Sequence, residues 1–409
     1  MLAWWKPVVA SLLLCVFVGS VAGADDPAAP LKARLARLQA LRAERPGDGT
    51  LAYYQALTHA ALGERDAALA QLRGLLGRKL GLVPAPGFGF ERLQSDADFI
   101  ALRNKLAAEE VATPPSPVSF RLDDPRLIPE GIAFDPRGQR FFVGSIARRK
   151  IVAIDRSGRP SDFSGPSDRL DAVLGLFVDA RRGRLYAVST NGFELSALSG
   201  RRNAVVRYDL RHGRLAARLP APAARQLNDV TVAVDGTVYA TDSAGGTLFR
   251  ARPGNTTLTP FGTAGTLPGA NGIVAAPDGA VYVALSTGIA RVDATTGVAA
   301  RLPQPDTVAT GGIDGLAWHD DALIGIQNTT NPGRVIRIAL DDGGARIEGV
   351  TVLQSHHHPD FDEPTTGVVA GQAFHVIANS HVARFQPDGR LKDAATLKPP
   401  VVLAVPLAR

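Results

Sequence analysis

The sequence contains a single cysteine, Cys15, among its 409 residues. This cysteine lies in an apolar run near the N-terminus that has the features of a secretory signal. If that signal is removed, the mature chain has no cysteine. Disulfide bonds, thiolate metal ligands and a cysteine nucleophile are then excluded.

The sequence also lacks clustered positive charge and a long apolar segment. The formal net charge is +6, but the basic residues are scattered through loops without interleaved aromatic residues, so nucleic-acid binding is not favoured. The apolar run from Val8 to Val21 is too short to cross a bilayer comfortably, and no later stretch compensates for it. We expect no membrane span in the mature chain.

Residues 1 to 24 have the organisation of a cleaved signal peptide. Lys6 supplies positive charge, the apolar run follows, and the small residues Ala22, Gly23 and Ala24 precede Asp25. We therefore expect a periplasmic or secreted bacterial protein.

Residues 30 to 112 are predicted to be helical. Leu31, Leu35, Leu38 and Leu41 recur at helical spacing, and residues 51 to 78 contain two amphipathic helices separated by a turn at 62 to 63. This pair resembles a tetratricopeptide-like hairpin, and a third helix is expected from Ser95 to Glu110. Because a single hairpin does not make a solenoid, two interpretations stay open. The segment is either a cap or spacer for the rest of the protein, or a docking module that contacts another protein.

A proline-rich linker at residues 111 to 117 precedes a change to short apolar runs separated by Asp-Gly, Arg-Gly and Pro-Gly turns. Six such units are present between residues 118 and 408, and Asn228, Asn271 and Asp314 recur at intervals of 43 residues. Repeats of this length with several short strands are typical of propeller blades. The expected fold class is mainly β: a six-bladed β-propeller preceded by a small α-helical region.

Four units carry an oxygen-bearing side chain at the same register. These residues are Glu130, Asn228, Asn271 and Asp314. An Asn or Asp before a small residue is often only a turn residue, but four in register predict side chains that meet at one end of the central channel. Two carboxylates and two amides, with no imidazole or thiolate, favour Ca²⁺, and less strongly Mg²⁺ or Mn²⁺, over Zn²⁺.

From about Leu127 onward the chain resembles the senescence marker protein/gluconolactonase/luciferin-regenerating-enzyme family of six-bladed propellers. The motifs that carry the resemblance are PEG at Glu130, LND at Asn228, ANG at Asn271 and IDG at Asp314. The resemblance implies a divalent-metal-dependent hydrolase of lactones or related esters, with these four residues as metal ligands. It also implies a role beside the metal or the substrate for Asp229.

The chain departs from the family pattern at two places. Sugar-lactonase members carry an Arg two positions before the blade-three Asn, where this chain has Gln226, with Arg225 one residue earlier. The histidine of blade two found in paraoxonase-like propellers has no counterpart here. Asp314, Asp229 or water on the metal therefore remain as attacking or activating groups, and water assisted by Asp314 is our first choice.

Several loops are expected at the rim of the site. The insertion from Thr190 to Asn203 is predicted to overhang it, with Glu194 and Arg201 reading polar groups of the substrate alongside Gln226 and Arg225. Residues 328 to 334 and 355 to 364 should approach the same face. Within these loops, His356, His357 and His358 are either a second metal site or a solvated loop. His381 and Asn379 either reach the rim or bond locally.

Function therefore has a first expectation and two alternatives. The first is hydrolysis of a small lactone or ester with Ca²⁺ at the channel mouth. The main alternative is a non-catalytic, calcium-stabilised propeller that binds a small ligand or a peptide. A lyase-type propeller similar to strictosidine synthase is less favoured, because those relatives lack the four metal ligands.

Overall fold

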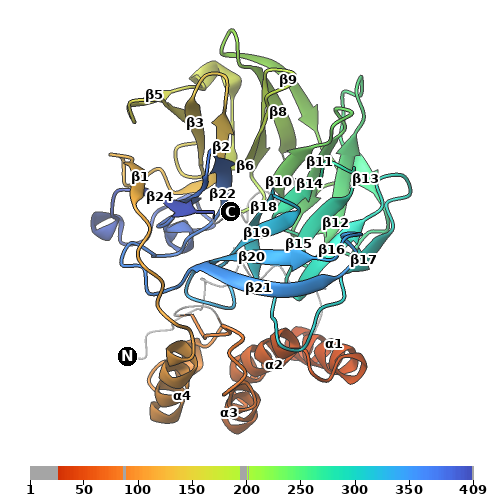
Figure 1. Cartoon of the computed structure of the whole chain (residues 1–409), viewed down its shortest axis with the longest axis vertical. Coiled ribbons are helices and arrows are strands. Elements are labelled where there is room, and N and C mark those ends of the chain that lie inside the picture. The colour runs from red at the N-terminus through yellow and green to blue at the C-terminus, as the bar shows by residue number, and fades with distance from the viewer. Residues whose placement is uncertain (1–25, 86–88, 194–199, 201, 408–409) are drawn as a thin grey trace.

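A computed structural model of the chain describes residues 26–85, 89–193, 200 and 202–407. Six four-stranded antiparallel sheets form the six blades of a β-propeller, with four helices before them (Figure 1). The predicted fold class is confirmed. The expected signal peptide lies outside the described residues. Among those that are described, no helix is long and apolar enough to cross a membrane.

Five blades follow one another along the chain, each built from consecutive strands. Their bounds are β2 Pro129–Asp135, β3 Arg140–Ser145, β4 Lys150–Ile154 and β5 Pro160–Asp162; β6 Ala172–Asp179, β7 Arg184–Thr190, β8 Asn203–Asp209 and β9 Arg214–Pro220; β10 Leu227–Val232, β11 Val238–Asp242, β12 Thr247–Ala251 and β13 Thr259–Phe261; β14 Ile273–Ala275, β15 Val281–Leu285, β16 Gly288–Val292 and β17 Ala299–Arg301; β18 Ile313–His319, β19 Ala322–Gln327, β20 Arg334–Leu340 and β21 Ile347–Gln354.

The sixth blade closes the ring. It combines β22 Gly367–Ala370, β23 Ala373–Ile377 and β24 Val401–Pro406 with β1 Val118–Arg121, which precedes the first blade in sequence but pairs with β24. The innermost strands of neighbouring blades contact one another all the way around, including β22 with β2. The beginning and the end of the propeller segment therefore belong to one sheet.

Small residues allow the inner strands to approach closely around the channel. A Cβ atom on Gly131 would lie 2.1 Å from the carbonyl oxygen of Leu174, and one on Gly272 would lie 2.4 Å from the carbonyl oxygen of Asp314. Both distances are too short for a real side chain. The glycine that follows three of the four expected ligands in the sequence therefore has a steric cause, which is the narrowness of the channel at that level; Asn228 is instead followed by Asp229.

The helices are α1 Ala29–Glu44, α2 Gly49–Leu62, α3 Arg65–Arg73 and α4 Ala97–Ala108, and they share an apolar core of their own. The expected turn at residues 62 to 63 is present, with Gly63 at φ +83° ending α2. The third predicted helix begins one residue later than its Ser95 signal, because Asp96 is the capping residue and accepts a hydrogen bond from the Phe99 N–H.

The helical segment lies against the propeller, on the side of the blade that contains β18 to β21 (Figure 1). Backbone and side-chain bonds join the two parts: the Val83 N–H donates to the Thr330 carbonyl at 2.8 Å, and Arg301 contacts Asp48 at 2.9 Å. Glu110, just beyond α4, is buried in a salt bridge with Arg334 of β20 at 2.9 Å.

Candidate metal centre

The four expected ligands lie at the beginning of inner strands from four different blades. Glu130 is in β2, Asn228 in β10, Asn271 immediately before β14, and Asp314 in β18. All four line one small void of about 20 Å³, together with Glu363 and the apolar side chains of Ile146, Leu174, Phe193 and Val382. The structure therefore brings together at one end of the channel residues that are up to 184 positions apart in the sequence.

Three oxygen atoms of this group have no hydrogen-bond partner among the described residues. They are Glu130 Oε2, Asn228 Oδ1 and Asn271 Oδ1, and all three are buried. Asn228 is held by its Nδ2, which donates to Ser243 Oγ at 2.9 Å. Buried polar atoms are normally satisfied, so three unpaired oxygens in one set indicate a missing partner. An all-oxygen donor set fits a hard divalent cation such as Ca²⁺.

The pKa values of the carboxyl groups at this site are raised, which means that their environment disfavours the charged form. Burial, together with the charges of Asp314 and Asp229, raises the pKa of Glu130 well above its usual range. Burial raises the pKa of Asp314 to about 6, although hydrogen bonds from Asn328 and Asn271 oppose this shift. A cation between the two carboxylates would remove the repulsion and lower both pKa values.

No group of three or more His, Cys, Asp or Glu residues suited to hold a metal occurs within the described part of the chain. The four residues here contain only two carboxylates, and the other two donors are amides. This negative result therefore does not count against the four residues. The evidence for a cation here is the unpaired oxygens of the two amides and of Glu130.

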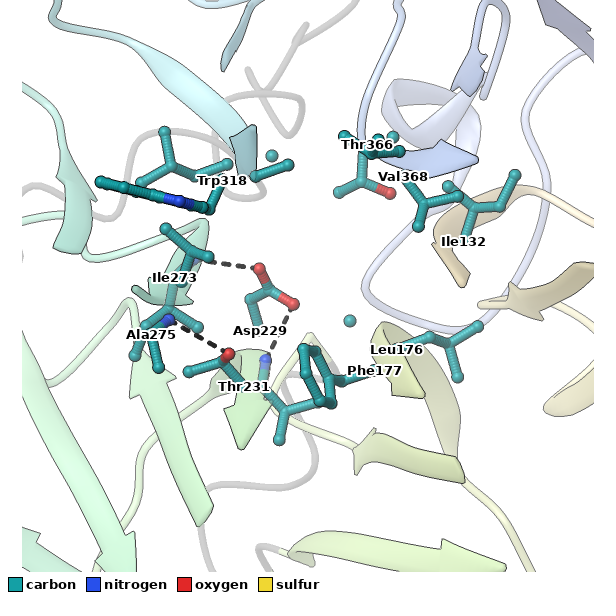
Figure 2. Close-up of a pocket in the computed structure, with 18 residues that line it drawn as sticks. Ile132, Leu176, Phe177, Asp229, Thr231, Ile273, Ala275, Trp318, Thr366 and Val368 are labelled. Carbon is teal, nitrogen blue, oxygen red and sulfur yellow. Dashed lines mark hydrogen bonds between the residues drawn. The ribbon is translucent and has the colours of Figure 1, made fainter. Parts of the chain in front are cut away.

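Asp229 follows Asn228 in β10, but its side chain lines the channel cavity drawn in Figure 2 and not the void at the four expected ligands. Its carboxylate accepts hydrogen bonds from the N–H groups of Val230, at 2.8 Å, and Ile273, at 3.1 Å. Burial raises its pKa to about 7 against the effect of these two bonds, and the charge of Asp314 adds to the rise. Gly175 makes room for it, since a Cβ there would lie 2.1 Å from Asp229 Oδ1.

Two residues near the four expected ligands were not singled out by the sequence. Asn328 donates from Nδ2 to Asp314 Oδ2 at 2.5 Å and also to the Pro364 carbonyl at 2.8 Å, so it fixes one oxygen of Asp314. Glu363 lines the void and has φ +66°, a conformation that is rare for a residue other than glycine. Both lie in loops that the sequence predicted only as parts of the rim.

The expected substrate residues are not part of this void. Arg225 is exposed, and Gln226 is buried with its N–H bonded to Asp242 Oδ1 at 2.8 Å. Neither lines the voids at the metal ligands or the channel cavity. Glu194 and Arg201, in the overhanging loop, lie outside the described residues.

The histidines considered in the sequence make hydrogen bonds either at the junction between the helical segment and the propeller or to nearby residues. His356 contacts Glu110 of the helical segment at 2.5 Å, His357 contacts Ser355, and His358 contacts the Ser116 carbonyl. Their partners differ, so they belong to the junction between the helices and the propeller rather than to a second metal site. Asn379 and His381 bond to the neighbouring segment at residues 398 to 401.

Helix α2 covers the mouth of the site. Tyr54 lines a second void, of about 30 Å³, with Asn228, Asn271, Ser243 and other polar residues of the propeller. Tyr54 is only 4% exposed, its hydroxyl is hydrogen-bonded to Ser286, and burial raises its pKa to about 12. Each void holds little more than an ion and one or two waters. No local pattern in the sequence indicates this contact between distant segments.

No protein-family model matches the chain, and no curated protein matches its sequence. Solved structures similar to it include a gluconolactonase from Xanthomonas campestris, at 17% identity and a TM-score of 0.45, covering 73% of this chain and 99% of the other. A PQQ-bound aldose sugar dehydrogenase from Streptomyces coelicolor is 15% identical, with a TM-score of 0.45 and coverage of 72% and 96%. A virginiamycin B lyase from Staphylococcus aureus is 14% identical, with a TM-score of 0.46 and coverage of 69% and 82%. Similarities this distant carry no argument about activity.

Proposed function

We propose that the chain is a Ca²⁺-dependent hydrolase of lactones or related esters, with Glu130, Asn228, Asn271 and Asp314 as the metal ligands. The observation that carries this proposal is the set of three buried, unpaired oxygen atoms in the same void as the Asp314 carboxylate. The resemblance of the four motifs to the lactonase-like propellers supports the same substrate class.

A bound cation would polarise the carbonyl group of the substrate and stabilise the negative charge that develops on its oxygen. The protein residues supply the proton chemistry. Asp314 keeps a fixed orientation because Asn328 holds its Oδ2. We assign to Asp314 the acceptance of a proton from the attacking water. Asp229, with its pKa raised to about 7, is suited to hold and return a proton near neutral pH.

The test is a hydrolysis panel of γ- and δ-lactones, aryl esters and phosphotriesters, measured with Ca²⁺ and after exhaustive chelation. We expect hydrolysis of at least one lactone or carboxylic ester that is lost with chelator and returns with Ca²⁺. Hydrolysis that is indifferent to chelation would remove the proposed role of the four ligands.

The enclosure of the site favours a second candidate, a non-catalytic propeller stabilised by calcium. Tyr54 and Phe193 border voids of about 30 and 20 Å³, which have no room for a lactone ring. Under this alternative Ca²⁺ raises the melting temperature of the protein and no ester in the panel is hydrolysed. Under the first proposal, the cap formed by α2 must open to admit substrate.

We also propose that the protein is exported after cleavage at the end of residues 1 to 24. Sequencing the N-terminus of the protein recovered from a bacterial periplasm or culture medium tests this proposal. A mature chain beginning near Asp25 is the expected result, and an intact N-terminus in the cytoplasm would contradict it.

A further inference from the structure

The central channel contains a cavity that is distinct from the metal centre. Its volume is about 260 Å³, and the inner strands of all six blades line it. The side chains on its wall are mostly apolar, as Figure 2 shows: Ile132, Leu176, Phe177, Ile273, Trp318 and Val368. None of the four expected metal ligands lines it, and neither does any residue of the helical segment. Of the residues on its wall, the proposed hydrolysis uses only Asp229.

The cavity lies farther along the inner strands than the ligands do, toward the end of the channel away from α2. Burial decreases in that direction. In β18 the side chains from Ile313 to Leu316 are buried, whereas those from Ala317 to His319 are partly exposed. All four residues of β22 are partly exposed. The cavity is therefore reached from the face opposite the helical segment, which does not obstruct it.

The size of the cavity suits one small organic molecule. An apolar cavity of roughly 150 Å³ in a protein core binds benzene, so the larger channel cavity has room for a six-membered ring with a short substituent. Pockets that bind small molecules typically combine apolar walls with a few polar groups. Here the aromatic rings of Phe177 and Trp318 border the space and provide flat surfaces for a ring to pack against.

The ionisable side chain on this wall is Asp229, and it lies at the end nearest the metal ligands. Backbone N–H groups of Val230 and Ile273 each bond one of its oxygens. A carboxylate oxygen accepts more than one hydrogen bond, so both retain capacity for a further donor. The Thr231 hydroxyl is beside it and accepts from the Ala275 N–H at 3.3 Å. Asp229 and Thr231 thus form one polar spot on the wall, and the Thr366 hydroxyl and the Trp318 indole N–H are the other polar side-chain groups among the lining residues.

We propose that this channel cavity is a ligand site, entered from the face opposite the helices. It takes a small molecule with one aromatic or cyclic aliphatic ring and a hydroxyl or amino group that donates to Asp229. The metal ligands do not line it, so binding here does not depend on whether the metal centre hydrolyses esters.

Trp318 is a natural reporter of this site, because the chain has only three tryptophans and the other two are Trp4 and Trp5. In the full chain carrying Trp4→Phe and Trp5→Phe, tryptophan emission comes from Trp318 alone. We would titrate this protein with benzyl alcohol, benzylamine and toluene, in the presence of Ca²⁺ and again with chelator. The expected result is a saturable change in Trp318 emission under both conditions, with at least tenfold tighter binding of benzyl alcohol or benzylamine than of toluene.

Two variants locate the binding. Val368→Phe places a ring in the cavity and should weaken all three probes at least tenfold, whereas Val298→Phe, at a position that is 66% exposed, should change nothing. Asp229→Asn should reduce the advantage of the amine over toluene. No saturable change, or equal affinity in the Val368→Phe and Val298→Phe proteins, would overturn the proposal. Probe binding without ester hydrolysis would reject the proposed hydrolase and support this ligand site. Ester hydrolysis without probe binding would support the hydrolase and reject this ligand site.

Discussion

The amide of Asn228 has one hydrogen bond, from its Nδ2 to Ser243 Oγ, and its oxygen has no partner among the described residues. Leaving a buried acceptor unpaired costs about 1–3 kcal/mol, and the same cost recurs at Glu130 and Asn271. At the scale of single residues, this repeated cost separates the three candidate ligands from ordinary turn residues. A turn residue satisfies its own side chain locally, and these three do not.

Replacing Asp314 with alanine should abolish most of the stabilisation of the protein by Ca²⁺. An ion that binds only the native state stabilises it by about 2.7 kcal/mol at a hundredfold excess over its dissociation constant. The shift in melting temperature between chelator and Ca²⁺ measures this effect. Asp320→Ala is the control, because that side chain is 75% exposed and near the other end of the same strand. In chelator, Asp314→Asn should have a melting temperature no lower than that of the native protein, because it removes the repulsion between Asp314 and Glu130. An equal Ca²⁺-induced shift in Asp314→Ala, Asp314→Asn and Asp320→Ala would contradict the metal site.

Gly175→Ala should impair hydrolysis while preserving the Ca²⁺ shift. The added Cβ would lie 2.1 Å from Asp229 Oδ1 and 2.6 Å from its Cα, so Asp229 must move. We expect a loss of about 1–3 kcal/mol in stability from the overpacking and a fall in kcat larger than the change in KM. Gly349→Ala is the matched control, because a Cβ there meets nothing within 4 Å. Unchanged kcat in Gly175→Ala would mean that Asp229 takes no part in the reaction.

At the scale of elements, helix α2 is the feature that most changes the interpretation of the site. The sequence left open whether the helical segment is a cap or a peptide-docking module. In the structure the two tyrosines of α2 lie against the propeller: the Tyr53 hydroxyl donates to the Thr329 carbonyl at 3.5 Å, and Tyr54 lines a void with Asn228 and Asn271. This face of the hairpin is occupied, which supports the cap.

The attachment of the helical segment should depend on pH through Glu110. Burial opposes ionisation of Glu110, but the hydrogen bond from His356 and the charge of Arg334 lower its pKa to about 2. Because the folded pKa is below the usual value of 4.5, the stabilisation is complete above about pH 4.5 and is lost as the pH falls toward 2. Glu110→Gln should cost about 3–5 kcal/mol at pH 7, since it leaves Arg334 buried without its counter-ion.

Melting temperatures of the native, Glu110→Gln and Glu348→Gln proteins between pH 7 and pH 3 test this prediction. The deficit of Glu110→Gln should shrink as the pH falls, whereas Glu348→Gln, in an exposed pair, should follow the native protein throughout. A constant deficit at every pH would show that the loss comes from packing rather than from charge.

At the scale of the whole molecule, closure of the ring ties the two ends of the propeller together. Strand β24 lies between β1 and β23, with Leu403 opposite Val118 on one side and Val376 on the other. The six sheets are thereby joined into one continuous ring, in which every blade packs on two neighbours. Such a ring should unfold as a unit, unlike an open array of repeats.

Leu403→Pro should destabilise every blade, because proline in a central strand removes a ladder hydrogen bond and does not fit between two neighbours. In the Trp4→Phe and Trp5→Phe background, Trp318 emission reports unfolding of the blade that contains β18. We expect this signal and the far-ultraviolet circular dichroism to shift together to a lower temperature. A Trp318 transition at the native temperature would show that the blades unfold independently.

The blade count and the set of metal-ligand candidates can both be predicted from the sequence alone. Both follow from local information: each unit repeats its own turn chemistry and strand pattern, and Asn228, Asn271 and Asp314 occupy the same register in successive units. In a closed ring of equivalent blades, equal register means equal height along the channel. The glycine after Glu130, Asn271 and Asp314 was also visible, although its cause, the contact with the neighbouring inner strand, was not.

The surroundings of those candidate ligands follow from the packing of the folded chain and not from the repeat pattern. Tyr54 meets Ser286, and Glu110 meets Arg334 at a separation of 224 positions, through packing between helices and propeller that no local periodicity encodes. Asn328, just after β19, bonds Asp314 at the start of β18, and Asp229 turns into the channel because Gly175 leaves space for it in the preceding blade. Long-range contacts depend on how helices and strands pack together after they have formed. The volume of the site, its enclosure by α2 and its accessibility are therefore set by the tertiary fold and cannot be predicted from the sequence repeat.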